Sequence, residues 1–115
     1  MKKKKILVVT PTKHIKKFNY NLKKNFQVIN LHNPSEQEFI KHSKNTKYIF
    51  TNPNMSNLFL SENNLKHFKD LKCICTASTG TNHIDLKYIK KKKIKLISLR
   101  KKLKIISAIS STAEL

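Results

Sequence analysis

Residues 73–86 read CICTASTGTNHIDL, and this stretch carries the clearest indication of the fold class. An apolar run passes into a small polar turn around Gly80, the only glycine of the 115-residue chain, and then into a stretch with the composition of a helix start. A glycine between a strand and a helix lets the backbone turn with a positive φ or approach a ligand closely. The stretch therefore predicts a strand–loop–helix unit of the kind found in parallel α/β sheets.

The same alternation extends over the rest of the chain. Short apolar runs predict strands at 5–10, 26–31, 47–51, 72–77 and 94–99. Apolar residues at helical spacing predict helices over 12–25, 33–45, 61–71 and 82–92. Two helix starts carry capping signals, Ser35 with Glu38 and Ser61 with Asn64. Strands alternating with helices predict a parallel sheet with helices on both faces.

Three loops rich in small polar residues follow predicted strands, at 10–12, 51–55 and 77–82. The carboxyl ends of parallel strands meet at one edge, where α/β sheets bind ligands. Backbone amides around Gly80 next to a helix start suit an anion such as a carboxylate. A plain strand-to-helix turn is the alternative. A dinucleotide fingerprint needs three glycines, so this loop is not one.

The composition fits one domain with a real core, since 38% of the residues are apolar. Lys and Arg number 25 against 6 Asp and Glu, which gives a net charge of +19. Such a charge indicates either a solvated lysine surface or a patch that faces a polyanion. Arg100 is the only arginine, and specific nucleic-acid readers depend on arginine. We therefore expect no specific nucleic-acid partner.

No apolar run approaches the roughly 20 residues that a membrane span needs. The run ILVV at 6–9 is too short for a signal peptide, so a cytoplasmic protein without a membrane partner is the simple interpretation. Cys73 and Cys75 lie two apart, on one face of a strand, and are predicted to be buried thiols rather than a disulfide. The five histidines show no metal-ligand spacing, and no metal is predicted.

The segments ASTGTNHIDL (77–86), IKLISL (94–99) and STAEL (111–115) together resemble the substrate-binding domain of D-isomer-specific 2-hydroxyacid dehydrogenases, in particular the phosphoglycerate dehydrogenase-like members. The family pattern is a G-x-[ND]-x-[IV]-D loop, a helix, a strand and an A-E-L step. The resemblance covers residues 47–115. It implies a flavodoxin-like substrate-binding (catalytic) domain over 1–115, with 110–115 starting an interdomain helix, truncated before a separate Rossmann NAD-binding domain.

The resemblance also implies roles for individual residues. The loop that holds the substrate carboxylate falls on Ser78, Thr79 and Gly80, and substrate-facing positions fall on Thr51 and Asn52. Thr112 falls near the nicotinamide, while Asn82 and Asp85 shape the loop and cap its helix. The catalytic arginine, glutamate and histidine of the family lie beyond the A-E-L step, so no catalytic residue is assigned. His83 is expected to face solvent, and Lys93 stands where the family has a glycine in a left-handed conformation.

The resemblance implies part of an oxidoreductase that acts on the CH-OH group of a 2-hydroxy acid, with NAD or NADP as hydride acceptor. We expect the 115-residue chain to be inactive alone and the full-length enzyme to be a homodimer that uses a small 2-hydroxy or 2-keto acid. The alternative is a non-enzymatic, basic flavodoxin-like domain that binds a polyanion such as RNA. A receiver-type signalling domain is less favoured because Thr10 and Thr51 stand where it needs acidic residues.

Overall fold

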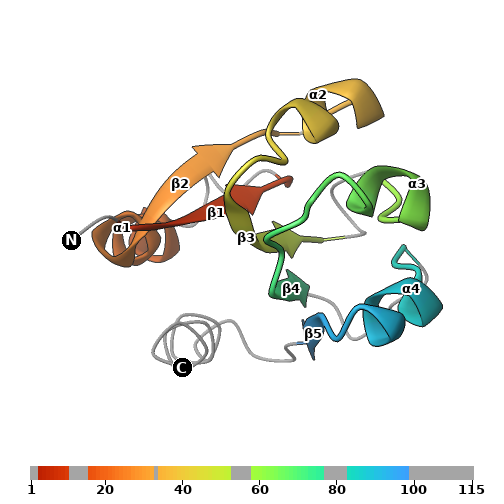
Figure 1. Cartoon of the computed structure of the whole chain (residues 1–115). Helices are drawn as coiled ribbons and strands as arrows, with labels where there is room; N and C mark the ends of the chain where they lie inside the picture. The colour runs from red at the N-terminus through yellow and green to blue at the C-terminus, as the bar shows by residue number, and fades with distance from the viewer. Residues whose placement is uncertain (1–2, 11–15, 33, 53–57, 77–82, 99–115) are drawn as a thin grey trace.

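The computed structural model describes residues 3–10, 16–32, 34–52, 58–76 and 83–98. Within these ranges lies a five-stranded parallel sheet (Figure 1), formed by β1 (Lys4–Val8), β2 (Phe26–Asn30), β3 (Thr46–Thr51), β4 (Cys73–Thr76) and β5 (Lys95–Ser98). The strand order is β2-β1-β3-β4-β5. This is the flavodoxin-like order. The predicted fold class is therefore confirmed.

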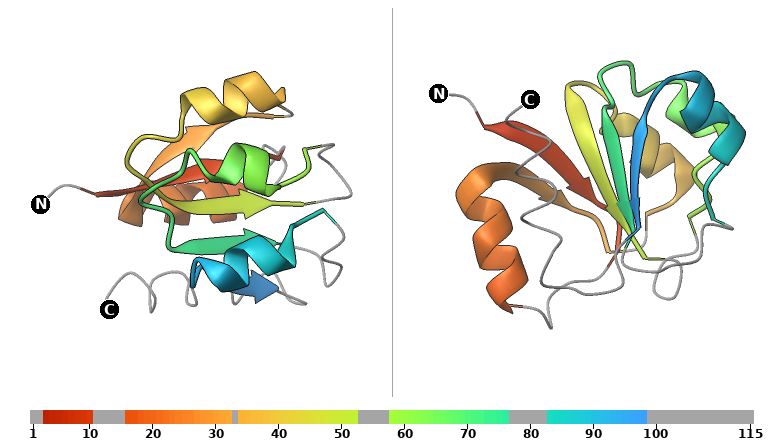
Figure 2. Two further views of the ribbon diagram at one scale, coloured as in Figure 1. Left: turned by 45° about the vertical axis from the view of Figure 1, so that its right-hand side comes forward. Right: turned by 90° about the horizontal axis from the view of Figure 1, so that it is seen from below.

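Helices cover both faces of the sheet, as Figure 2 shows. Helix α1 (Lys16–Asn25) packs on one face, and α2 (Glu36–Lys41), α3 (Glu62–Leu65) and α4 (Leu86–Lys91) pack on the other. Each strand is joined to the next through a helix, which is the connection that parallel strands require. No helix in the described part of the chain is long and apolar enough to cross a membrane.

The central strands β1, β3 and β4 are apolar because both of their faces are buried. Ile6, Leu7 and Val8 follow one another in β1 and are all fully buried. Leu7 belongs to the core cluster under α2, α3 and α4, whereas Ile6 and Val8 belong to the cluster under α1. Side chains of a strand alternate between the two faces, so a continuous apolar run fills both clusters. In the larger cluster, the rings of Phe39 and Phe68 lie 4.6 Å apart.

The helices on the larger cluster begin at their predicted caps. The Ser35 Oγ atom accepts a hydrogen bond from the Glu38 backbone N–H at 3.2 Å, which starts α2. At α3, the side-chain oxygen of Asn64 accepts a hydrogen bond from the Ser61 N–H at 3.0 Å. Each side chain satisfies a backbone donor that the first helical turn leaves unpaired. The capping residues that the sequence predicts therefore mark where α2 and α3 begin.

In the described residues all four helices are shorter than predicted, and two of the differences have a clear cause. Helix α3 was expected over 61–71 but ends at Leu65, because the chain continues in tighter turns such as Phe68 N–H to Leu65 O at 2.9 Å. The last helix was expected from 82 but begins at Leu86, because the Asp85 carboxylate caps it by accepting from the Tyr88 N–H at 3.2 Å. The cap at Asp85 agrees with the structural role that the resemblance gives this residue.

The two cysteines are free and fully buried on the α1 side of β4, as predicted. Their Sγ atoms lie 3.8 Å apart, within contact but not bonded. The hydrogen bond with Cys73, together with burial, raises the pKa of Cys75. Cys75 is therefore a protonated thiol that contributes to packing.

Lys93, which follows the C-cap of α4, has a φ of 59° and is exposed. A residue with a Cβ atom pays roughly 1–2 kcal/mol in this left-handed conformation, whereas glycine adopts it freely. We therefore expect Lys93→Gly to raise the free energy of unfolding by about 1 kcal/mol, measured by chemical denaturation. Lys91→Gly, an equal change inside α4, is the control and should lower it by about 1 kcal/mol. Equal effects of the two changes would contradict the conformation of Lys93.

Candidate functional site

The carboxyl ends of the strands meet at one edge of the sheet, toward which all the arrows of Figure 2 point. Thr51 at the end of β3 pairs with Thr76 at the end of β4, and Thr76 pairs with Ser98 at the end of β5. Thr10 follows β1 at the same edge. Residues in register on neighbouring parallel strands point to the same face. Thr51 and Thr76 therefore form a hydroxyl pair on the side covered by α3 and α4.

These threonines are buried, although their hydroxyl groups are polar. Thr10, Thr51 and Thr76 are between 0% and 1% exposed. Among the described residues, the Oγ1 atoms of Thr10 and Thr51 have no hydrogen-bond partner. A buried hydroxyl without a partner costs free energy, and such groups are uncommon in native structures. The carboxyl edge thus holds hydrogen-bonding capacity that the described fold does not use.

His83 joins this edge from the segment before α4. Its Nε2 atom lies 3.4 Å from Thr76 Oγ1, and its buried Nδ1 atom has no partner within the described ranges. The segment is held in place because the Leu60 N–H donates to His83 O and the Asp85 N–H donates to Leu60 O, both at 2.8 Å. The expectation that His83 faces solvent is therefore wrong.

Burial lowers the pKa of His83 below its ordinary value of 6.5. The charged form of the ring loses hydration when it is buried, so the neutral imidazole is favoured. At neutral pH the ring then offers one donor and one acceptor nitrogen. The edge accordingly presents hydroxyl groups and a neutral imidazole, a set that can hydrogen-bond a hydroxyl, carbonyl or carboxylate oxygen. Among the described residues there is no cluster of three or more side chains suited to a metal ion.

The predicted site residues divide into two groups. Thr51 and Asn52 are described, and they lie buried and half-buried at the carboxyl edge. The remaining predicted site residues lie outside the described ranges: Ser78, Thr79, Gly80 and Thr112. The loop that contains three of them follows Thr76 directly and is followed by His83. The two ends of that loop are therefore fixed at the edge where Thr51 lies.

Neither Thr76 nor His83 was predicted as a site residue. A signal for Thr76 exists, because both Thr51 and Thr76 close an apolar strand and precede a polar loop. No comparable signal exists for His83. Its contact with Thr76 depends on how the chain returns to the sheet edge after the loop, and this return is visible only in three dimensions.

Known proteins resemble this chain in sequence and in fold. The family model described as "D-isomer specific 2-hydroxyacid dehydrogenase, catalytic domain" matches residues 6–104. Among solved structures, a protein from Pyrococcus horikoshii OT3 is similar with a TM-score of 0.75 and 24% identity, over 84% of this chain and 28% of that one. No match was found among curated proteins.

Two further solved structures were determined with a cofactor. The NAD+-bound 3-phosphoglycerate dehydrogenase of Entamoeba histolytica gives a TM-score of 0.72 at 20% identity, over 84% of this chain and 32% of that one. The D-lactate dehydrogenase of Aquifex aeolicus, complexed with NAD and lactic acid, gives a TM-score of 0.64 at 25% identity, over 83% of this chain and 27% of that one. The chain thus spans less than a third of the length of each of these three structures.

Proposed function

Because the chain belongs to the D-isomer-specific 2-hydroxyacid dehydrogenase family, we propose that it binds the substrate of such an enzyme. The reaction would oxidise the CH-OH group of a small 2-hydroxy acid to the 2-keto acid, or the reverse, with NAD or NADP as the hydride carrier. The observation that carries the proposal is the set of buried, unused polar groups at the carboxyl edge, beside the loop that contains Gly80.

Each side chain and amide has a distinct role in this proposal. The backbone amides of Thr79 and Gly80, with Ser78, bind the substrate carboxylate, because amides that point outward near a helix start attract an anion. Thr51 and Asn52 face the rest of the substrate and hydrogen-bond its oxygen atoms. His83 is a positioning residue: its neutral ring contacts Thr76 and fixes the end of the loop. No proton transfer is assigned to it.

The residues of this chain do not fit a dinucleotide cofactor. The phosphate-binding fingerprint requires three glycines between a strand and a helix, and the sequence contains one glycine. NAD or NADP would therefore be held by a separate domain, and Thr112 is the residue proposed to approach its nicotinamide. We assign no residue of this chain a catalytic role in the hydride transfer.

The proposal is tested by titrating the ¹⁵N-labelled chain with pyruvate and, as the matched control, with acetone, which lacks the carboxylate. We expect pyruvate, with a Kd on the order of 1–10 mM, to shift the amide signals of 78–80 and of Thr51, while acetone shifts neither. Thr51→Val should weaken pyruvate binding by about threefold to tenfold, since one hydrogen bond is lost. Signals that respond equally to both ligands would contradict a carboxylate site at this edge.

A second buried threonine provides the control for the fold. Thr46 is also fully buried, but its Oγ1 donates a hydrogen bond to the His42 carbonyl. Thr46→Val should lower the free energy of unfolding by about 1 kcal/mol, whereas Thr51→Val should leave it unchanged or raise it by up to about 1 kcal/mol. A Thr51→Val variant that is destabilised like Thr46→Val would show that the hydroxyl serves the fold instead of a ligand.

A further inference from the structure

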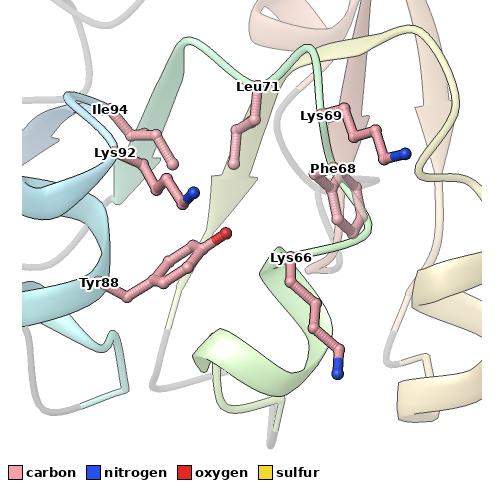
Figure 3. A pocket seen from close by; sticks show the side chains of 7 residues that line it. All are labelled: Lys66, Phe68, Lys69, Leu71, Tyr88, Lys92 and Ile94. Carbon is pink, nitrogen blue, oxygen red and sulfur yellow. The ribbon is translucent and has the colours of Figure 1, made fainter.

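A cavity of about 330 Å³ lies between α3 and α4 (Figure 3). It opens beside the turns that lead into β4 and β5, which are at the amino ends of these strands. The candidate substrate site lies at the opposite, carboxyl edge. The cavity is therefore a separate feature of the domain, and the proposed dehydrogenase function does not use it.

The floor of this cavity is apolar. Phe68 and Leu71 come from the turns after α3, and Ile94 comes from the residue before β5. Phe68 and Leu71 are part of the larger core cluster, and Ile94 packs against it. A flat apolar ligand group in this cavity would have one of its faces shielded from water, because these side chains belong to or pack on the core.

Two polar groups point into the same space. In Figure 3 the Tyr88 hydroxyl and the Lys92 ammonium group, both from the α4 end of the cavity, extend toward one another and toward the ends of Leu71 and Ile94. Burial and the charge of Glu62 raise the pKa of Tyr88, so its hydroxyl stays protonated and can donate. A donor and a cation that line one cavity are suited to one oxyanion.

The charge around the opening favours an anion as well. Lys66 and Lys69 line the cavity on the α3 side, and in Figure 3 their ammonium groups extend outward from it. With Lys92 they contribute three positive charges to the lining, which holds no acidic side chain among the described residues; the Glu62 carboxylate lies outside the lining but near enough to Tyr88 to raise its pKa. Such a ring of like charge raises the local concentration of anions, and the attraction weakens with salt.

We infer that this cavity binds a small ligand that carries an anionic group on a flat apolar ring, such as an aromatic carboxylate. The ring lies on Phe68, Leu71 and Ile94, and the anion accepts hydrogen bonds from the Tyr88 hydroxyl and the Lys92 ammonium group. The volume is at the lower end of the range of small-molecule sites, which limits the ligand to about one or two fused rings.

The test uses 2-naphthoate as the probe, followed by NMR on the full chain. We expect saturable binding with a Kd on the order of 1 mM or tighter, with the largest shifts at Phe68, Leu71 and Tyr88. Two ligand controls separate the parts of the inference. Neutral 2-naphthol supplies the ring without the charge, and inorganic phosphate supplies the charge without the ring; both should bind at least about fivefold more weakly.

The variants locate the site. Lys92→Gln and Tyr88→Phe should each weaken 2-naphthoate binding by about three- to tenfold. Lys91→Gln, the same charge change at the neighbouring exposed residue of α4, should leave it unchanged within about twofold. Equal losses for Lys91→Gln and Lys92→Gln would show a general attraction to a basic surface and would overturn the site. Absence of binding, or phosphate binding as tightly as naphthoate, would also overturn it.

Discussion

Replacing Phe39 by alanine is expected to lower the free energy of unfolding by about 3–5 kcal/mol, because the change removes a ring from a fully packed interior and leaves a cavity. Phe39 is 0% exposed, and its ring packs 4.6 Å from that of Phe68. This contact joins α2 to the turns after α3 on one face of the sheet. The loss is a large fraction of the total stability of a small domain, so we expect partial unfolding at 37 °C.

Phe59 supplies the matched control, since it is 50% exposed. Phe59→Ala should change the free energy of unfolding by less than about 1 kcal/mol, because the side chain already contacts water. Both variants are compared by urea denaturation followed by far-UV circular dichroism. Similar losses for the two phenylalanines would contradict the packing of α2 against the sheet.

The 115-residue chain is expected to oxidise no NADH in the presence of 2-keto acids, which is the largest effect that we predict. Family enzymes accelerate their reactions by a factor of about 10⁶ or more, as enzymes typically do. The chain supplies at most the amides proposed to bind the carboxylate and the polar edge around Thr51, and its sequence has one glycine and one arginine, Arg100. Binding a substrate without the groups that stabilise the transition state does not accelerate the reaction.

The measurement is the loss of NADH absorbance with pyruvate and with longer 2-keto acids, using an intact dehydrogenase of the family as the positive control. Host dehydrogenases can contaminate such a preparation, so the Thr51→Val variant is purified and assayed in parallel. Turnover that falls with Thr51→Val would belong to this chain and would overturn the prediction. Turnover that is equal in both preparations would belong to the contaminant.

Much of the fold was predictable because its signals are local. The apolar strands, the caps at Ser35 and Ser61 and the buried thiol pair at Cys73 and Cys75 each depend on residues within a few positions of one another. The left-handed conformation at Lys93 was not predicted: lysine in place of a glycine indicated a local rearrangement, whereas the structure keeps a φ of 59° there. Helix ends were less predictable, as α3 shows, because several hydrogen-bonding patterns compete after the first turn.

The candidate site was predictable only in outline. The carboxyl edge followed from the order of strands and loops, and Thr51 was proposed from the family resemblance, but the pairing of Thr51 with Thr76 depends on the register of β3 and β4. The contact between His83 and Thr76 depends in addition on the backbone bonds that tie Leu60 to the segment before α4. Thr51 lies far from Thr76 in the sequence, and Leu60 lies far from His83, so no local pattern identifies these pairs.

The sequence by itself determined the alternation of strands and helices and the single glycine loop, because hydrophobic period and capping act over a few residues. The pairing of Thr51 with Thr76, the place of His83 at the carboxyl edge and the cavity between α3 and α4 are visible only in three dimensions. These features join segments distant in the chain. Their geometry follows from how the two faces of the sheet are covered, and this depends on the packing of all the elements together.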